Sequence, residues 1–234
     1  MQLKVREFRP RIGPVEYRVV QPWEPLRHTA LGNPDGYGCL IGDHEGLARL
    51  AALFSFAAYS PRTIVHVPLR KGTPLGEYEN LIESCGGRVD LVLVHHSLGL
   101  RVTKWPELRR RLVNGRPVTV RTDEARTNRD HATWLERRND DENRDWLRPA
   151  VHASTLFLTG SRDVLASAST QFEFAAGRGL REENVPKGHS VLVSMLSWEL
   201  RPDPSVHRMQ FDICFKAHPP YEHFRRPGRR LPAA

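Results

Sequence analysis

Cysteine is scarce in this sequence and does not occur in a metal-binding spacing. The chain contains three cysteines, Cys39, Cys85 and Cys214, with no CxxC pair among them. An odd number of widely separated cysteines argues against a disulfide framework and against a zinc knuckle. This pattern is typical of proteins in a reducing compartment, so we expect a cytoplasmic protein.

Long hydrophobic runs are also missing. No apolar run approaches the roughly 18 residues that a membrane-spanning helix needs. The N-terminal residues MQLKVREFRP contain no apolar segment of the kind found in signal peptides. We therefore expect no membrane span, no signal peptide and no membrane partner.

The sequence contains no diagnostic catalytic motif. It has neither a Walker loop nor an HExxH pair. Gly36, Gly38 and Gly42 have a spacing similar to a dinucleotide-binding loop, but the first two precede a predicted strand, whereas such a loop must follow its strand. The sequence thus leaves the reaction, the cofactor and the oligomeric state undetermined, and it assigns no metal ligand.

Lysine is rare, whereas arginine is abundant. Of the 35 basic residues five are lysines, which leaves 30 arginines, and the formal net charge is +8. We interpret the excess of arginine as the composition of a GC-rich genome. The charge is compatible with a nucleic-acid partner, but the arginines are not interleaved with the aromatic residues that stacking on bases requires, so we do not favour one.

The most strongly predicted strand lies within residues 88–97, RVDLVLVHHS. Its apolar run is uninterrupted, which is typical of a strand buried on both faces in the middle of a parallel sheet. Further strands are predicted over residues 37–42, 62–67 and 116–122, separated by helices over 45–60, 76–85 and 105–113. This alternation predicts an α/β fold with a mostly parallel, Rossmann-like sheet and flanking helices.

The C-terminal part differs in pattern. Residues 154–159 read as another strand and residues 162–177 as a helix. The segments 189–200 and 206–216 then predict an antiparallel hairpin that closes the sheet, with Phe211 and Ile213 buried. We expect one α/β domain over residues 1–224, with a β-rich lead-in over 1–36, and a mobile basic tail over 225–234.

Residues 123–148 are highly polar, with Trp134 and Trp146 among their few large apolar side chains. We interpret the segment as a solvated helix or lid held by these two tryptophans. The alternative is an arginine-rich binding arm.

The run of residues 90–99, DLVLVHHSLG, resembles the fourth strand of class I methyltransferases. Those enzymes also end in an antiparallel hairpin, so the resemblance implies a Rossmann-like, methyltransferase-related domain. The chain departs from that family in having no GxGxG after its first predicted strand and no acidic residue at the end of the second.

Polar side chains gather at the predicted carboxyl ends of strands, where open α/β sheets bind ligands. As acid/base residues we select Asp43, His44, His95 and His96. As substrate-binding residues we select Ser97, Arg121, Asp123 and Arg126. His218 is interpreted as an incidental histidine near the tail.

These residues predict a cytoplasmic enzyme that acts on a small polar or nucleotide-like ligand at the carboxyl edge of the sheet. The alternative is a non-catalytic interaction protein, in which the sheet is a scaffold and the arginine-rich segments make the contacts.

Overall fold

The structure is a computed structural model, and it describes residues 1–34, 37–72, 80, 82–83, 86–140, 142–179, 190–200 and 210–218. Most of the helix expected over residues 76–85 and all of the tail expected over 225–234 lie outside the described residues.

The larger of the sheets has seven strands. They are β1 (Gln2–Phe8), β4 (Arg18–Pro22), β7 (Thr63–Val67), β8 (Asp90–His95), β9 (Arg116–Arg121), β10 (Arg148–Val151) and β11 (Thr155–Gly160). Their spatial order is β10-β11-β8-β7-β4-β1-β9, so β8 is an inner strand, and its apolar residues are buried as expected.

The larger sheet is mixed, and the prediction of a mostly parallel Rossmann-like sheet is wrong. Among its neighbouring pairs, β8–β11 and β4–β7 are parallel, whereas the other four pairs are antiparallel. The consecutive strands β7 and β8 are antiparallel, whereas the alternation of strands and helices predicted a parallel pair. An uninterrupted apolar run shows that a strand is buried on both faces, and an inner strand of a mixed sheet satisfies that condition equally well.

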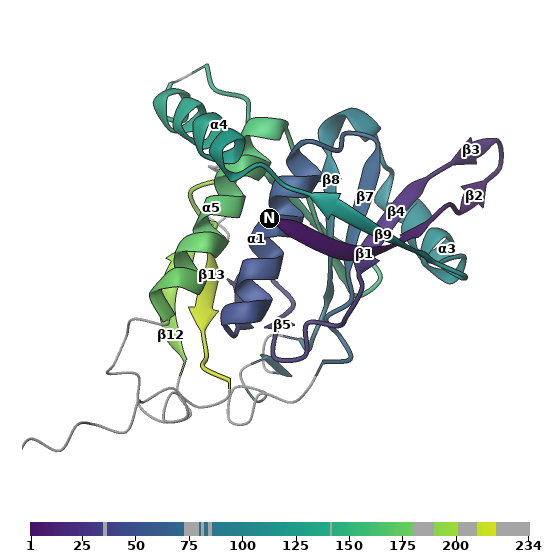
Figure 1. The fold of residues 1–234 in the computed structure, drawn as a ribbon, viewed down its shortest axis with the longest axis horizontal. Coiled ribbons are helices and arrows are strands. Elements are labelled where there is room, and N and C mark those ends of the chain that lie inside the picture. The colour runs from purple at the N-terminus through teal and green to yellow at the C-terminus, as the bar shows by residue number, and fades with distance from the viewer. Residues whose placement is uncertain are drawn as a thin grey trace, which may run out of the picture.

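A second sheet contains four strands. They are β5 (Ala30–Leu31), β6 (Tyr37–Gly42), β12 (Val191–Met195) and β13 (Gln210–Phe215), in the order β12-β13-β6-β5. β12 and β13 pair antiparallel, and Phe211 and Ile213 are buried, as expected. This pair does not close the larger sheet, however, because β13 pairs with β6 in parallel. A two-stranded hairpin, β2 (Arg11–Ile12) and β3 (Val15–Glu16), projects from one end of the molecule (Figure 1).

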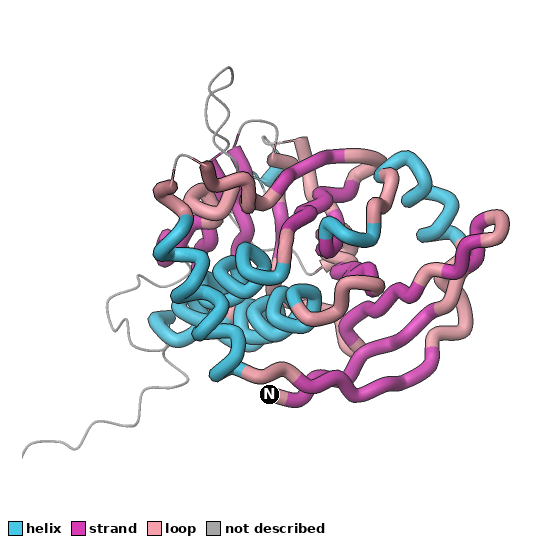
Figure 2. The backbone as a smooth tube through the Cα atoms, turned by 90° about the horizontal axis from the view of Figure 1, so that it is seen from above, coloured by secondary structure: helices cyan, strands magenta, loops and turns pink. Residues whose placement is uncertain are grey.

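The described helices are α1 (His44–Ala58), α3 (Trp105–Arg110), α4 (Glu124–Arg137) and α5 (Arg162–Gly179), with 3-10 turns η1 (His96–Leu98) and η2 (Val102–Lys104). α1 packs along α5 and against β7 and β8, whereas α5 contacts β12 and β13. Figure 1 shows α1 between α5 and the larger sheet, and Figure 2 shows the long helices gathered beside the strands. Within the described part of the chain, no helix is both long and apolar enough to cross a bilayer.

α1 begins immediately after β6, and this junction positions the candidate site. The carboxylate of Asp43 accepts a hydrogen bond from the backbone N–H of Gly46 at 2.8 Å, which caps the first turn. Leu47, Leu50 and Phe54 are fully buried, so the helix is held in place by its apolar face.

The polar segment after β9 forms α4, and two tryptophans anchor it as expected. Trp134 is fully buried, and its ring meets that of Trp146 edge to face at 5.9 Å between centroids. The indole N–H of Trp134 donates to the carbonyl of Asp145 at 3.0 Å. The interpretation as a helix held by two tryptophans is therefore confirmed.

Candidate functional site

Three strands of the smaller sheet bring polar residues to one end. β6 and β13 are parallel neighbours whose last residues, Gly42 and Phe215, lie opposite each other. Asp43 follows β6, and His218 lies just beyond β13. β5 runs antiparallel to β6, so His28, which precedes β5, arrives at the same end. This is the type of position at which α/β sheets bind ligands, at the carboxyl ends of adjacent parallel strands.

A pocket of about 390 Å³ opens at this end, and we call it the polar pocket. The lining residues that carry polar or charged groups include Arg27, His28, Asp43, Glu45, Arg49 and His218. A pocket with several polar groups converging on it is a default candidate for a binding site.

The imidazole rings of His28 and His218 stack in the polar pocket. Their centroids are 3.4 Å apart and their planes are inclined by 20°. Burial lowers the pKa of His28 below its ordinary value of 6.5, and the neighbouring His218 and Arg27 lower this pKa further, whereas Asp43 opposes the shift. The neutral form of His28 therefore predominates at pH 7, and this form can accept a proton.

Asp43 provides a buried carboxyl group beside these rings. The residue is buried, with 7% of its surface exposed. Burial raises the pKa of Asp43, whereas the hydrogen bond from Gly46 and the proximity of His28 and His218 lower it. Asp43 and His28 thus place a carboxyl group beside an imidazole, and both groups can act as general acids or bases.

The charged residues at the rim of the polar pocket are of both signs. Arg49 forms ion pairs with Glu45, four residues earlier on α1, and with Glu24 at 3.5 Å. Arg27 is exposed. Because carboxylates and guanidinium groups both line the pocket, the lining suits a neutral polar group better than a phosphate, which favours a concentration of positive charge.

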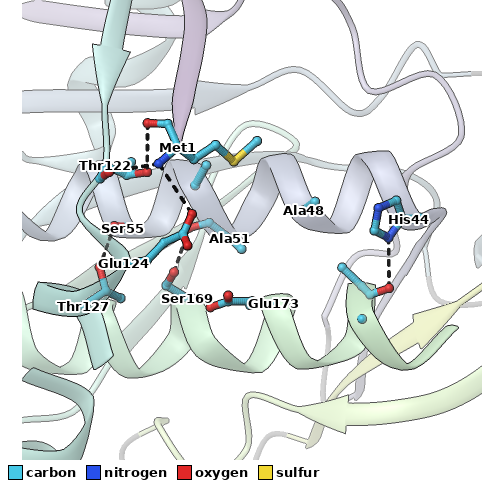
Figure 3. A pocket seen from close by; sticks show the side chains of 13 residues that line it. Met1, His44, Ala48, Ala51, Ser55, Thr122, Glu124, Thr127, Ser169 and Glu173 are labelled. Carbon is cyan, nitrogen blue, oxygen red and sulfur yellow. Dashed lines mark hydrogen bonds and ion pairs between the residues drawn. The ribbon is translucent and has the colours of Figure 1, made fainter. Parts of the chain in front are cut away.

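The predicted residue His44 lies outside the polar pocket. Its Nδ1 is 3.0 Å from the carbonyl oxygen of Ala176 on α5. His44 instead lines a second pocket of about 220 Å³, which lies along α1 and α5 and which we call the helix pocket (Figure 3).

His95 is the last residue of β8 in the larger sheet, and His96 and Ser97 follow it in the turn η1. β8 and β6, the strand that precedes Asp43, belong to different sheets, so the predicted residues at their ends do not share one sheet edge. Nδ1 of His95 lies 2.8 Å from the hydroxyl of Ser97, and the rings of His95 and His96 meet edge to face at 4.7 Å. His96 and Ser97 are exposed, and the three residues form a local turn apart from the described lining of the polar pocket.

The predicted substrate-binding residues near α4 have structural contacts. Asp123 caps α4 by accepting a hydrogen bond from the N–H of Arg126 at 3.0 Å. The guanidinium of Arg126 lies over the ring of Tyr59, 4.1 Å from its centroid. Arg121 is exposed at the end of β9, opposite Gln2 of β1. None of the three belongs to the described lining of the polar pocket.

His28 and His218 are not among the site residues predicted from the sequence. His28 lies in a segment rich in proline and glycine, and His218 lies near the expected tail. Their contact depends on the pairing of β13 with β6 across most of the chain, and hydrophobic periodicity carries no information about such long-range pairing.

Over the described residues, no group of three or more histidine, cysteine, aspartate or glutamate side chains is arranged to hold a metal ion. Comparisons of the chain with family models, with curated proteins and with solved structures find no match.

Proposed function

We propose that this protein is an enzyme that acts on a polar ligand in the polar pocket by general acid–base chemistry. The observation that carries the proposal is the convergence of a buried carboxyl group, Asp43, with the stacked imidazoles of His28 and His218. Titratable groups with shifted pKa values in one pocket are typical of active sites.

Each residue has a role that follows from its surroundings. The neutral imidazole of His28 takes the proton from water or a hydroxyl group as its oxygen adds to the ligand. Asp43 stabilises the imidazolium that forms, since its carboxylate favours the charged ring. The imidazolium then returns the proton to the leaving group, and burial of the His28 ring favours that return, because burial disfavours the charged form.

The mixed charges around the pocket favour a neutral polar group, such as an ester or an amide, at the reacting end. Hydrolysis or acyl transfer is therefore the reaction class that we propose. A cytoplasmic location is part of the proposal, and the odd number of cysteines without a CxxC spacing supports it.

Hydrolysis of p-nitrophenyl acetate tests the proposal without knowledge of the natural substrate. We expect hydrolysis by the protein to exceed that of an equal concentration of free imidazole, and His28→Gln to lower the rate by roughly 100-fold, as expected for the loss of a general base. His96→Gln is the matched control, because His96 is an exposed histidine at the end of β8. Equal losses in the two variants, or no rate above that of imidazole, would show that the polar pocket is not catalytic.

A further inference from the structure

Three pockets follow one another along α1. A middle pocket of about 420 Å³ lies between the polar pocket and the helix pocket. It shares Glu24, Glu45 and Arg49 with the polar pocket. It shares Met1, His44 and Ala48 with the helix pocket. Because neighbouring pockets share lining residues, the three lie in a row along α1, and we call this row the groove.

The groove is long compared with a small polar ligand. Asp43 lies at one end and Ser55 at the other. These residues are twelve positions apart, which corresponds to about 18 Å along a helix that rises about 1.5 Å per residue. A ligand that filled the groove would therefore be an extended chain.

The helix pocket presents apolar contacts, because its hydroxyl groups are already hydrogen-bonded within the protein. The hydroxyls of Ser55 and Thr127 lie 2.8 Å apart, and the hydroxyl of Ser169 donates to the carbonyl of Ala51 at 2.8 Å. The methyl groups of Ala48 and of neighbouring alanines form the apolar part of the lining, whereas Glu124 and Glu173 bring carboxylates to it, and Glu124 is paired with the N-terminal ammonium of Met1 at 3.4 Å (Figure 3). A peptide would leave backbone groups unpaired on such a floor, whereas a hydrocarbon chain needs no hydrogen-bond partner.

The boundaries between the pockets are compatible with a continuous ligand. At the first boundary, Arg49 pairs with the exposed Glu24 at 3.5 Å, and exposed ion pairs of this kind are weak and open readily. At the second boundary, Met1 lies over α1 (Figure 3), and a methionine side chain adapts its shape to what it contacts.

We propose that the ligand is an amphipathic acyl compound, with its ester or amide group in the polar pocket and an unbranched apolar chain lying along α1 as far as the helix pocket. This inference rests on the proposed function, because it places the reacting end of the ligand beside Asp43 and His28. It adds the substrate class, which the polar pocket alone leaves open.

Binding of hexanamide, octanamide and decanamide, measured by isothermal titration calorimetry, tests the inference. Since each buried methylene favours binding, we expect Kd to fall by roughly tenfold for every two carbons added. Ala48→Phe places a ring at the boundary between the middle and helix pockets, and it should remove this dependence on chain length. Ala132→Phe on the exposed surface of α4 is the matched control and should preserve it.

A Kd that does not fall from hexanamide to decanamide, absence of binding by decanamide, or equal behaviour of the two phenylalanine variants would each overturn the inference. Where Ala48→Phe does not fold, nuclear Overhauser contacts between the terminal methyl of decanamide and the methyl groups of Ala51 and Ala176 decide the question, and their absence overturns it. The His28→Gln variant separates the two proposals. If the groove binds acyl chains but His28 is not catalytic, the His28→Gln variant keeps the dependence of Kd on chain length and hydrolyses p-nitrophenyl acetate as fast as the wild type does.

Discussion

Asp43 lies at the junction of β6 and α1, where its proposed chemical role adds to a structural one. Its carboxylate caps α1, and the same carboxyl group lies in the polar pocket with His28 and His218. The sequence was sufficient to select this residue, because an aspartate between a buried strand and a helical pattern predicts both a cap and an edge position. It was not sufficient to select the partners of Asp43, which lie in segments without periodicity.

The two roles of Asp43 are separable by substitution. Asn is as good a helix cap as Asp, so Asp43→Asn should change the free energy of unfolding by less than about 1 kcal/mol, whereas Asp43→Ala should lower it by about 1 kcal/mol or more. Both variants should lose hydrolysis of p-nitrophenyl acetate, because both lose the carboxylate. Urea unfolding and rate measurements check this, and an active Asp43→Asn variant would restrict the residue to capping.

The buried residue Glu199 should make the free energy of unfolding depend on pH. It is fully buried, and burial raises its pKa to about 6, although hydrogen bonds from Ser167 and Gln171 oppose the shift. The folded state therefore retains a proton that the unfolded state, with a pKa of 4.5, has released. The stabilisation is complete below pH 4.5 and is lost as pH rises through 6.

Glu199→Gln removes this titration. We compare the free energy of unfolding of the variant with that of the wild type at each pH. This difference should favour the variant by about 2 kcal/mol more at pH 8 than at pH 4, since one pKa unit corresponds to about 1.4 kcal/mol. Urea unfolding at the two pH values gives the comparison. If the free energies of unfolding of the two proteins change equally between the two pH values, the pKa of Glu199 is not raised by folding, and the prediction is wrong.

At the scale of elements, the sequence predicted which segments are strands and helices better than it predicted how they pair. The hydrophobic pattern of β8 and α1 predicts which of their residues are buried. Strand direction has no such signature, so the antiparallel pairing of β7 with β8 could not be read from the sequence. The same holds for β13, whose parallel pairing with β6 depends on residues far apart in the chain.

The position of β13 gives a prediction at the element scale. Phe211 is almost fully buried, and its ring lies so close to Gly38 of β6 that a Cβ atom at Gly38 would be 2.6 Å from it. Phe211→Ala should therefore cost about 3–5 kcal/mol, because it leaves a cavity between β13 and β6. Leu192 of β12 is exposed and supplies the control, so Leu192→Ala should cost far less. A loss below about 1 kcal/mol for Phe211→Ala would mean that β13 is not part of the core.

At the scale of the whole molecule, the proposed site belongs to the smaller sheet and not to the larger one. The general rule that ligands bind at the carboxyl ends of parallel strands predicted a site at Asp43, and it also selected His95 at the end of β8, which pairs in parallel with β11. The structure contains both parallel pairs, but only the β6–β13 pair brings a carboxyl group and two imidazoles into a described pocket. The rule thus locates candidate edges, and side-chain geometry decides between them.

The pKa of His28, measured by NMR titration of the histidine ring protons, tests most directly whether Asp43, His28 and His218 form one site. The wild-type pKa should lie below 6.5. His218→Gln should raise it, because the variant removes a neighbouring imidazole, and Asp43→Asn should lower it further, because the variant removes a negative charge. His96→Gln should leave it unchanged. A His28 pKa at or above 6.5 that responds to neither Asp43→Asn nor His218→Gln would contradict the account.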